Sequence, residues 1–347
     1  MLRQLDRRAV RNGLIAALLL IAGIYFGSAG MRYFDPALIV YASASVFAAF
    51  AIVYRYSVWL SKPPTGLYWR RGWQLFLRPK ELPANLVMLV KLLWNDIVAQ
   101  TFIERRNHLR WGAHLLISWG CIVAALVTFP LSFGWVGFEP APNDPMTYQA
   151  VVMGVRTASF PSTSIVGFLT FHVLDFCAIA ILLGMVFAMR RRMYDPGAQA
   201  VQQFGPDFLP LILLFSICVT GLMLTASSMW MFGHSYSFIS LLHAFTVIVT
   251  LVYLPFGKFF HIFQRPAQLG VAYYKQEGDR TAQAACRRCG EAFASQMHVE
   301  DLKTTLDELG LDQRLDEGGH YQEVCPTCRR KLMALNQMQA IGGPGFL

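Results

Sequence analysis

Hydrophobic residues along this chain gather in long segments that carry almost no charge, unlike the mixed pattern of a soluble domain. Residues 208–257 contain no Asp, Glu, Lys or Arg. A helix needs about 20 apolar residues to cross a bilayer, so this segment predicts two spans joined by a tight turn near Gly233. Applied to the whole chain, the same rule predicts six spans: residues 12–29, 36–60, 111–133, 162–189, 208–231 and 236–263.

Composition agrees with this pattern. The chain has 347 residues, of which 55% are hydrophobic and 15% charged, whereas soluble domains contain about 25% charged residues. We expect an all-α polytopic membrane protein, a six-helix transmembrane bundle with a small cytoplasmic tail that binds a metal through four cysteines. The expected segments are two N-terminal spans (1–61), a basic loop (62–110), a four-helix core (111–263) and the tail (264–347). The first span follows a basic start without a small-x-small cleavage site, so we expect it to be uncleaved.

Basic residues predict the orientation. The N-terminal segment and the loops after spans two and four are rich in Arg and Lys, whereas the alternate loops contain only Arg32 and Arg156. Cytoplasmic loops carry the excess of basic residues, so we expect both termini in the cytoplasm and the protein in the inner (plasma) membrane. These loops and anionic lipid account for the net charge of +9, and we expect no nucleic-acid partner.

The long basic loop contains the apolar stretch LPANLVMLVKLLWNDIVAQTFIERR, whose hydrophobic residues recur at helical spacing. This pattern predicts an amphipathic helix. Two alternatives stay open: a helix that lies at the membrane surface or docks a partner, and a helix packed beneath the bundle.

Four histidines, His114, His172, His243 and His261, fall within the predicted spans or at their ends. Ionisable groups are rare inside spans and are functional by default. His243 and His261 are eighteen residues apart, which is five helical turns. A continuous sixth helix would therefore place both on one face, about 27 Å apart along its axis.

The predicted direction of each span pairs these histidines by depth. His114 and His261 lie near the cytoplasmic surface, and His172 and His243 lie in the outer half. A pair of imidazoles on facing helices is what the iron of a six-coordinate b-type haem needs. The pairs therefore predict two haems b, an inner one on His114 and His261 and an outer one on His172 and His243.

The segments RWGAHLLISWG and LLHAFTVIVTLVYLPFGKFFHIF resemble the dihaem cytochrome b membrane subunits related to the gamma subunit of respiratory nitrate reductase. The membrane subunit of heterodisulfide reductase belongs to the same group. The resemblance covers about residues 100–263. It implies electron transport between membrane quinone and an iron–sulfur partner subunit of a respiratory oxidoreductase complex, and it extends directly to His114, His243 and His261.

The chain also departs from that family. The gamma subunit places two ligands ten residues apart on one helix, but the residue ten positions after His114 is Ala124, which cannot bind iron. His172 is therefore assigned to the outer haem by its depth, with His234 as a substitute. His108 is a further alternative ligand, although its place before span three also suits an interface residue.

Two charged residues near these histidines have alternative roles. Asp175 lies one helical turn after His172, where it could orient the imidazole through its second nitrogen, take part in proton transfer with quinone, or be a neutral acid bonded to backbone. Lys258 could pair with a haem propionate or extend to the membrane interface.

The cysteines divide into two groups. Cys121, Cys177 and Cys218 occur singly in spans, where a small buried thiol packs as an apolar residue. The other four form two CxxC motifs in the tail: Cys286, Cys289, Cys325 and Cys328. Two such motifs predict a tetrahedral thiolate site, and CRRCGEAF resembles a zinc-ribbon knuckle. We expect one zinc ion, with iron as the alternative, and a short helix between the motifs that ends near Gly310.

Together these features predict an electron-transfer subunit of a quinone-linked complex, with substrate catalysis on a partner chain docked on the cytoplasmic face. Two other functions remain open: a polytopic transporter and a non-redox membrane scaffold with a zinc-ribbon docking tail. Transporters often show internal repeats and matching broken helices, and the sequence shows neither.

Overall fold

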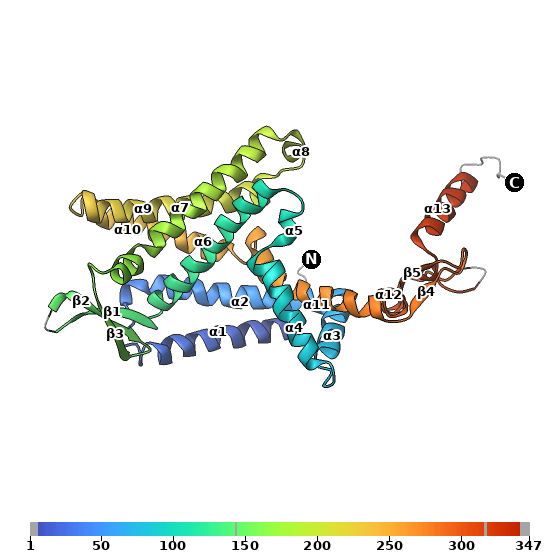
Figure 1. Ribbon diagram of the computed structural model, residues 1–347, viewed down its shortest axis with the longest axis horizontal. Coiled ribbons are helices and arrows are strands. Elements are labelled where there is room, and N and C mark those ends of the chain that lie inside the picture. The colour runs from blue at the N-terminus through green and yellow to red at the C-terminus, as the bar shows by residue number, and fades with distance from the viewer. Residues whose placement is uncertain (1–5, 143, 316–317, 341–347) are drawn as a thin grey trace. The chain divides into compact units, whose positions relative to one another are not determined.

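The structure, a computed structural model, describes residues 6–142, 144–315 and 318–340 (Figure 1). Its α-helices are α1 (Arg7–Gly27), α2 (Ile39–Ser61), α3 (Thr65–Phe76), α4 (Leu82–Leu93), α5 (Thr101–Glu104), α6 (His108–Ser132), α7 (Ile165–Tyr194), α8 (Pro196–Gln199), α9 (Leu209–Trp230), α10 (Tyr236–Tyr253), α11 (His261–Arg280), α12 (Gln296–Glu308) and α13 (Pro326–Ala340). Its strands are β1 (Val136–Ala141), β2 (Asp144–Val152), β3 (Val155–Pro161), β4 (Gln283–Ala285) and β5 (Ala292–Ser295). Short π-helices occupy Trp94–Val98 and Phe204–Phe208.

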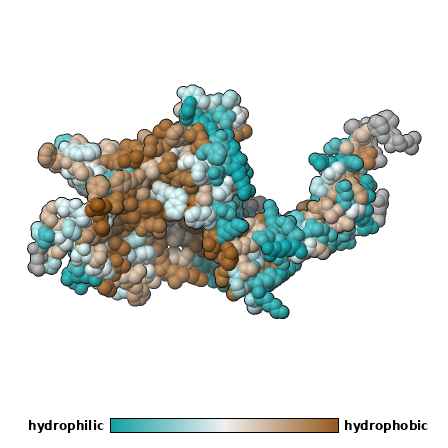
Figure 2. Space-filling view, in the orientation of Figure 1, coloured by the Kyte–Doolittle hydropathy of each residue, from teal (hydrophilic) through white to brown (hydrophobic). Residues whose placement is uncertain are grey.

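Six helices are long and apolar enough to cross a membrane: Arg7–Gly27, Pro36–Ser61, His108–Ser132, Ile165–Tyr194, Phe204–Trp230 and Tyr236–Tyr253. At most 28% of the most apolar window of any span is buried by protein. Hydrophobic side chains accordingly cover most of the visible surface of these helices (Figure 2). Such a surface needs lipid rather than water around it. The predicted six-span helical fold is confirmed, and the chain is a multi-pass membrane protein.

The sixth span is shorter than predicted. Helix α10 ends at Tyr253, and a new helix begins at His261. Pro255 lies between them and lacks the N–H that would continue the helix, and Gly257 takes an extended conformation (ψ −163°). The expectation of one continuous helix that carries His243 and His261 on a single face about 27 Å apart is therefore wrong.

The chain forms two compact units, Met1–Ser57 with Leu92–Phe263 and Val58–Lys91 with Gln264–Leu347. In the first unit, α7 packs against both α6 and α9, and α9 packs against α10 (Figure 1). The contact between α6 and α7 is close because glycines line it. A Cβ atom on Gly184 would lie 2.7 Å from the Ala113 carbonyl oxygen, and one on Gly120 would lie 2.6 Å from Ile181 Cγ1.

A three-stranded antiparallel sheet, in the order β1-β2-β3, lies between α6 and α7 and contacts both helices. Sequence analysis predicted only a loop here. The β2–β3 hairpin turns at Met153 and Gly154, both in the left-handed region (φ +48° and +82°). Its aromatic side chains pack on Phe171 of α7, with Phe138 and Tyr148 at ring-centroid distances of 5.6 and 5.0 Å. We call the end of the spans that carries this sheet the sheet end and the other the loop end.

The second unit combines two helices of the predicted basic loop with the chain after residue 264. Leu75 of α3 and Tyr273 and Tyr274 of α11 are buried together. Asp301 of α12 is 4% exposed and accepts hydrogen bonds from the Tyr274 hydroxyl (2.7 Å) and the Arg71 guanidinium (3.2 Å). Burial and this bond to a carboxylate raise the pKa of Tyr274 above its ordinary value.

The amphipathic stretch of the loop forms α4, a π-helix and α5 in succession, rather than one helix.

The tight contact between α6 and α7 gives a testable prediction. We expect Gly184→Ala to lower the free energy of unfolding by roughly 1–3 kcal/mol, because its methyl group would overlap a backbone carbonyl. Gly112→Ala on α6 is the matched control, since no atom beyond its own stretch of helix lies within 4 Å of the added Cβ. Thermal unfolding in detergent measures both variants. Equal stabilities would contradict the close packing.

Candidate cofactor and metal sites

The structure places the four histidines in the two halves of the first unit. His172 and His243 each lie seven residues after the first residue of α7 and α10, which is about 10 Å along each helix. Both helices begin at the sheet end, so these two histidines share one depth. His114 lies near the start of α6, and His261 is the first residue of α11, both toward the loop end.

At the sheet end, His172 belongs to a chain of hydrogen bonds between two helices. Its Nδ1 lies 2.8 Å from Asp175 Oδ2, and the Thr225 hydroxyl of α9 donates to Asp175 Oδ1 at 2.7 Å. The predicted contact between Asp175 and His172 is therefore present. An ionised carboxylate only accepts, so an ionised Asp175 would hold the imidazole proton on Nδ1.

Helix α9 also supports His243. Its Nδ1 lies 2.9 Å from the Thr220 hydroxyl oxygen, and that hydroxyl lies 2.6 Å from the Ser216 carbonyl, to which it donates its proton. Thr220 therefore accepts from Nδ1. Gly221 leaves room for the ring, because a Cβ there would already lie 3.5 Å from His243 Cε1. Helix α9 has no histidine, yet it supports both histidines of this depth.

At the loop end, the Nδ1 atoms also face acceptors. His114 Nδ1 lies 2.6 Å from Gln100 Oε1, and His261 Nδ1 lies 2.6 Å from the Lys258 carbonyl oxygen. In all four histidines an oxygen atom thus faces Nδ1, and a proton on Nδ1 leaves the lone pair on Nε2. Histidines that bind metals usually carry such a second hydrogen bond, which orients the ring and fixes its tautomer.

The two helices that carry the sheet-end histidines do not pack closely on each other. Helices α7 and α10 both contact α9 extensively, but they make no comparable contact with each other. Within the described part of the chain, no hydrogen bond or ring contact joins His172 to His243. The structure places this pair at one depth and leaves the two rings apart.

Cations gather around the loop-end turn that contains His261. Asp207 Oδ1 lies 2.6 Å from Lys258 Nζ and 3.4 Å from Arg192 Nη1. Arg55 stacks on the Phe260 ring at 4.2 Å and donates to the Pro255 carbonyl. Lys258 therefore has an internal carboxylate partner, which sequence analysis did not foresee.

The two alternative ligands lie at helix ends. The His108 side chain is 84% exposed and lies 3.9 Å from Glu104. His234 is exposed in the turn between α9 and α10, where its carbonyl accepts from the Ser227 hydroxyl at 2.7 Å.

The four tail cysteines come together as predicted. Their sulfur atoms all lie within 4.8 Å of one another, and Cys289 Sγ is 3.8 Å from Cys325 Sγ. A tetrahedron with Zn–S bonds of about 2.3 Å has sulfur–sulfur edges of about 3.8 Å. The site is therefore the right size for a tetrahedral ion.

Local structure explains this geometry. Cys286 and Cys289 occupy the turn between β4 and β5, where Gly290 takes the left-handed conformation (φ +75°). Cys325 immediately precedes α13, and its backbone N–H donates to Cys286 Sγ at 3.2 Å. The α12 helix lies between the motifs and ends before Gly310, which confirms that prediction.

Electrostatics favour metal binding at this cluster. Burial raises the pKa of the Cys286 thiol. Hydrogen bonds from the backbone N–H groups of Cys325, Cys289 and Arg288 outweigh burial and lower this pKa to about 6. The hydrogen bond to Cys325 and burial raise the pKa of Cys328 to about 12. The thiols therefore share their protons unequally, and a bound cation would displace them all.

Comparisons with family models, with curated proteins and with solved structures found no match to this chain. The assignment of the sites therefore depends on their geometry and chemistry.

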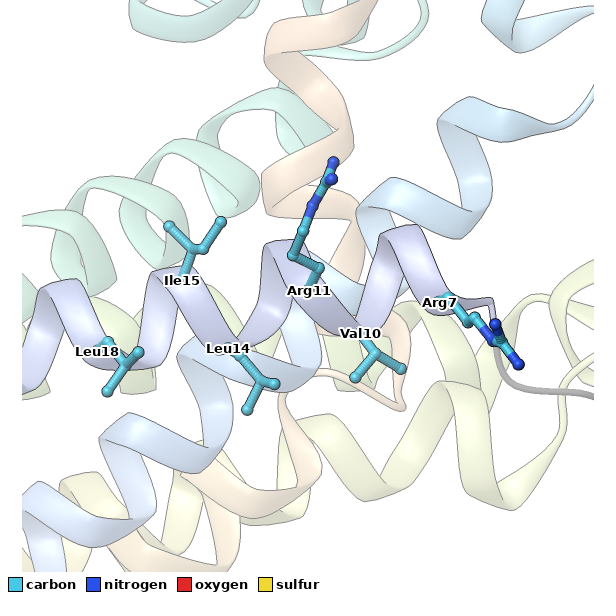
Figure 3. A pocket seen from close by; sticks show the side chains of 6 residues that line it. All are labelled: Arg7, Val10, Arg11, Leu14, Ile15 and Leu18. Carbon is cyan, nitrogen blue, oxygen red and sulfur yellow. The ribbon is translucent and has the colours of Figure 1, made fainter.

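An open cavity of about 340 Å³ lies along α1 and is lined by Arg7, Val10, Arg11, Leu14, Ile15 and Leu18. Figure 3 shows these side chains pointing away from the helix in different directions, with Arg11 and Ile15 on one side and Val10 and Leu14 on the other. These six lining residues include no histidine or cysteine, and their composition suits lipid.

Loss of single cysteines tests the metal site. We expect the purified full-length chain to retain about one non-haem metal ion, and Cys289→Ser and Cys328→Ser to lose most of it, because a tetrahedral thiolate site needs four sulfurs. Cys121→Ser, a change within a spanning helix, is the control and should keep the ion. Elemental analysis after dialysis against a mild chelator measures the content, and full retention in both tail variants would contradict the site.

Proposed function

We propose that this chain is the membrane-anchoring dihaem b-type cytochrome subunit of a respiratory oxidoreductase complex. It would pass electrons between the quinone pool and an iron–sulfur partner subunit that carries the substrate chemistry. One observation supports this function above others: four histidines at two depths of a spanning bundle each have an acceptor on Nδ1. An imidazole whose Nδ1 is bonded to such an acceptor suits axial ligation of iron through Nε2.

In this proposal the four histidines hold two haem groups. His172 and His243 would hold the outer haem, since they share a depth and come from helices that are not packed directly together. His114 and His261 would hold the inner haem. When bound, haem supplies one-electron transfer between the two depths. The protein's own part is to orient the four rings and to hold each imidazole proton on Nδ1.

The surroundings of each pair differ in charge. Asp175 brings an acidic group to the outer pair, where it accepts from His172 and from Thr225. An acid inside a span is costly unless it is paired, and these two donors supply the pairing. We propose that Asp175 also holds or releases a proton beside a quinone that binds at this depth.

Positively charged side chains lie near His261, where the proposed inner haem would bind. Haem carries two propionate groups, and Arg55, Arg192 and Lys258 lie at the turn that holds this histidine. Positive side chains stabilise such carboxylates. We assign this end to the cytoplasmic side by the positive-inside rule, with both termini in the cytoplasm and the protein in the inner membrane.

The four-cysteine site completes the proposal as a structural element. We assign zinc to it, because the β4–β5 turn and the intervening α12 resemble a zinc ribbon. Zinc is redox-silent, so the tail would fold a docking surface for the iron–sulfur subunit rather than carry electrons.

A visible spectrum of the purified chain tests the central claim. We expect about two haems per chain with b-type absorption on reduction, and about one in His243→Ala or His261→Ala, because each substitution removes an axial ligand. His108→Ala is the matched control and should retain both. A colourless protein, purified from cells supplied with haem, would rule out the proposed function.

Impermeant thiol labelling of intact spheroplasts tests the orientation. Ala158 on β3 and Ala200 after α8 are both exposed and lie on opposite sides in the proposed topology. Ala158→Cys should label in intact spheroplasts, whereas Ala200→Cys should label only after permeabilisation, because the membrane blocks the reagent. The reverse result would invert the orientation.

A further inference from the structure

Gln100 has an unusual backbone for its residue type. It lies in the left-handed region (φ +53°, ψ 40°), between the π-helix Trp94–Val98 and α5. Left-handed geometry strains a residue with a side chain, and such strain and π-helices both concentrate at functional sites. The residue is nevertheless only 5% exposed. A buried amide in a strained turn needs specific partners.

Those partners determine how the amide is oriented. Gln100 Nε2 donates to the Ile97 carbonyl (3.2 Å) and the Ser118 hydroxyl (2.9 Å). A carbonyl can only accept, so the amide NH2 must face Ile97. The amide oxygen therefore faces His114, 2.6 Å from its Nδ1. An amide oxygen also only accepts, so His114 must be the donor.

The turn that carries Gln100 is tied to the same helix as His114. Trp111 Nε1 donates to the Ala99 carbonyl at 2.6 Å, and Trp119 Nε1 donates to the Val98 carbonyl at 3.1 Å. Trp111, His114, Ser118 and Trp119 recur at helical spacing along α6. Both indoles thus bond to the turn immediately before Gln100, which leaves the amide little freedom to move away from the imidazole.

We infer that Gln100 is the positioning residue for His114, and that its amide oxygen holds the imidazole proton on Nδ1 and presents Nε2 as the ligating nitrogen. The assignment of iron as the metal that His114 binds rests on the proposed function. The assignment of the tautomer does not rest on it, because the tautomer follows from hydrogen bonds within the protein.

Nitrogen NMR of histidine-labelled protein in lipid bilayers, without added haem, tests the tautomer directly. At about pH 8 imidazoles are neutral, and the two tautomers give separate signals. His114→Asn identifies the His114 signal by its loss. We expect this signal to be Nδ1-protonated in the unmodified chain and to become a mixture in Gln100→Gly. Glycine accepts left-handed backbone without strain, so this variant removes the amide while keeping the turn.

Two further variants separate positioning from structural support. Gln100→Glu should preserve the Nδ1 proton, because a carboxylate accepts at the same place. Ser118→Ala should also preserve it, since it removes a bond to the amide nitrogen only. A purely structural role would lower the melting temperature of Gln100→Gly and leave the tautomer unchanged. An unchanged tautomer in that variant therefore overturns the inference.

Haem content gives the second measurement. With haem supplied, we expect Gln100→Gly to retain about one haem per chain and Gln100→Glu and Ser118→Ala about two, because only the first loses the orienting acceptor. If the unmodified chain binds no haem, the proposed function fails while the tautomer still decides the role of Gln100. Full haem retention in Gln100→Gly, with b-type spectra unchanged, would also overturn the inference.

Discussion

An imidazole within a spanning bundle must find its hydrogen-bond partners in the protein, because lipid supplies none. This constraint accounts for the surroundings of His114, His172 and His243, which lie within spans, whereas His261 begins the helix that follows the sixth span. The acceptors differ in chemistry: a glutamine amide, an aspartate carboxylate, a threonine hydroxyl and a backbone carbonyl. They nevertheless have the same effect, which is to place the proton on Nδ1.

Helix α9 shows how residues without cofactor chemistry organise a site. Thr220 and Thr225 lie five residues apart on it and serve His243 and Asp175, respectively. Because α9 packs against both α7 and α10, it sets the depth of both histidines at once. Small hydroxyl side chains suit this position, since they bond within the bundle and still allow close helix packing.

The second unit faces a different physical problem. Much of its chain is polar, and small polar domains seldom bury enough apolar surface to fold without a cross-link or metal. The four cysteines lie where such a metal would join two segments far apart in sequence. A backbone bond from Arg287 to Glu323 already joins the two knuckles, and Lys303 bonds Glu323 at 2.6 Å. Their mutual interaction raises the pKa of Lys303 and lowers that of Glu323.

The sequence by itself determined the six spans and the cysteine cluster, and it singled out four histidines as candidate ligands. Each depends on residue type at short spacing: an apolar run predicts a span, and paired CxxC motifs predict a metal site. Hydropathy did not locate the break at Pro255, because the apolar run continues beyond α10. The β1–β3 sheet was also missed, since strand pairing depends on partners distant in sequence. The sequence predicted the contact between Asp175 and His172, but only the tertiary structure decided which acceptors serve His114 and His243. Gln100 precedes His114 by fourteen residues, and Thr220 precedes His243 by twenty-three. No periodicity connects such pairs. They meet because a strained turn and a neighbouring helix bring them together, and packing sets that proximity rather than residue type.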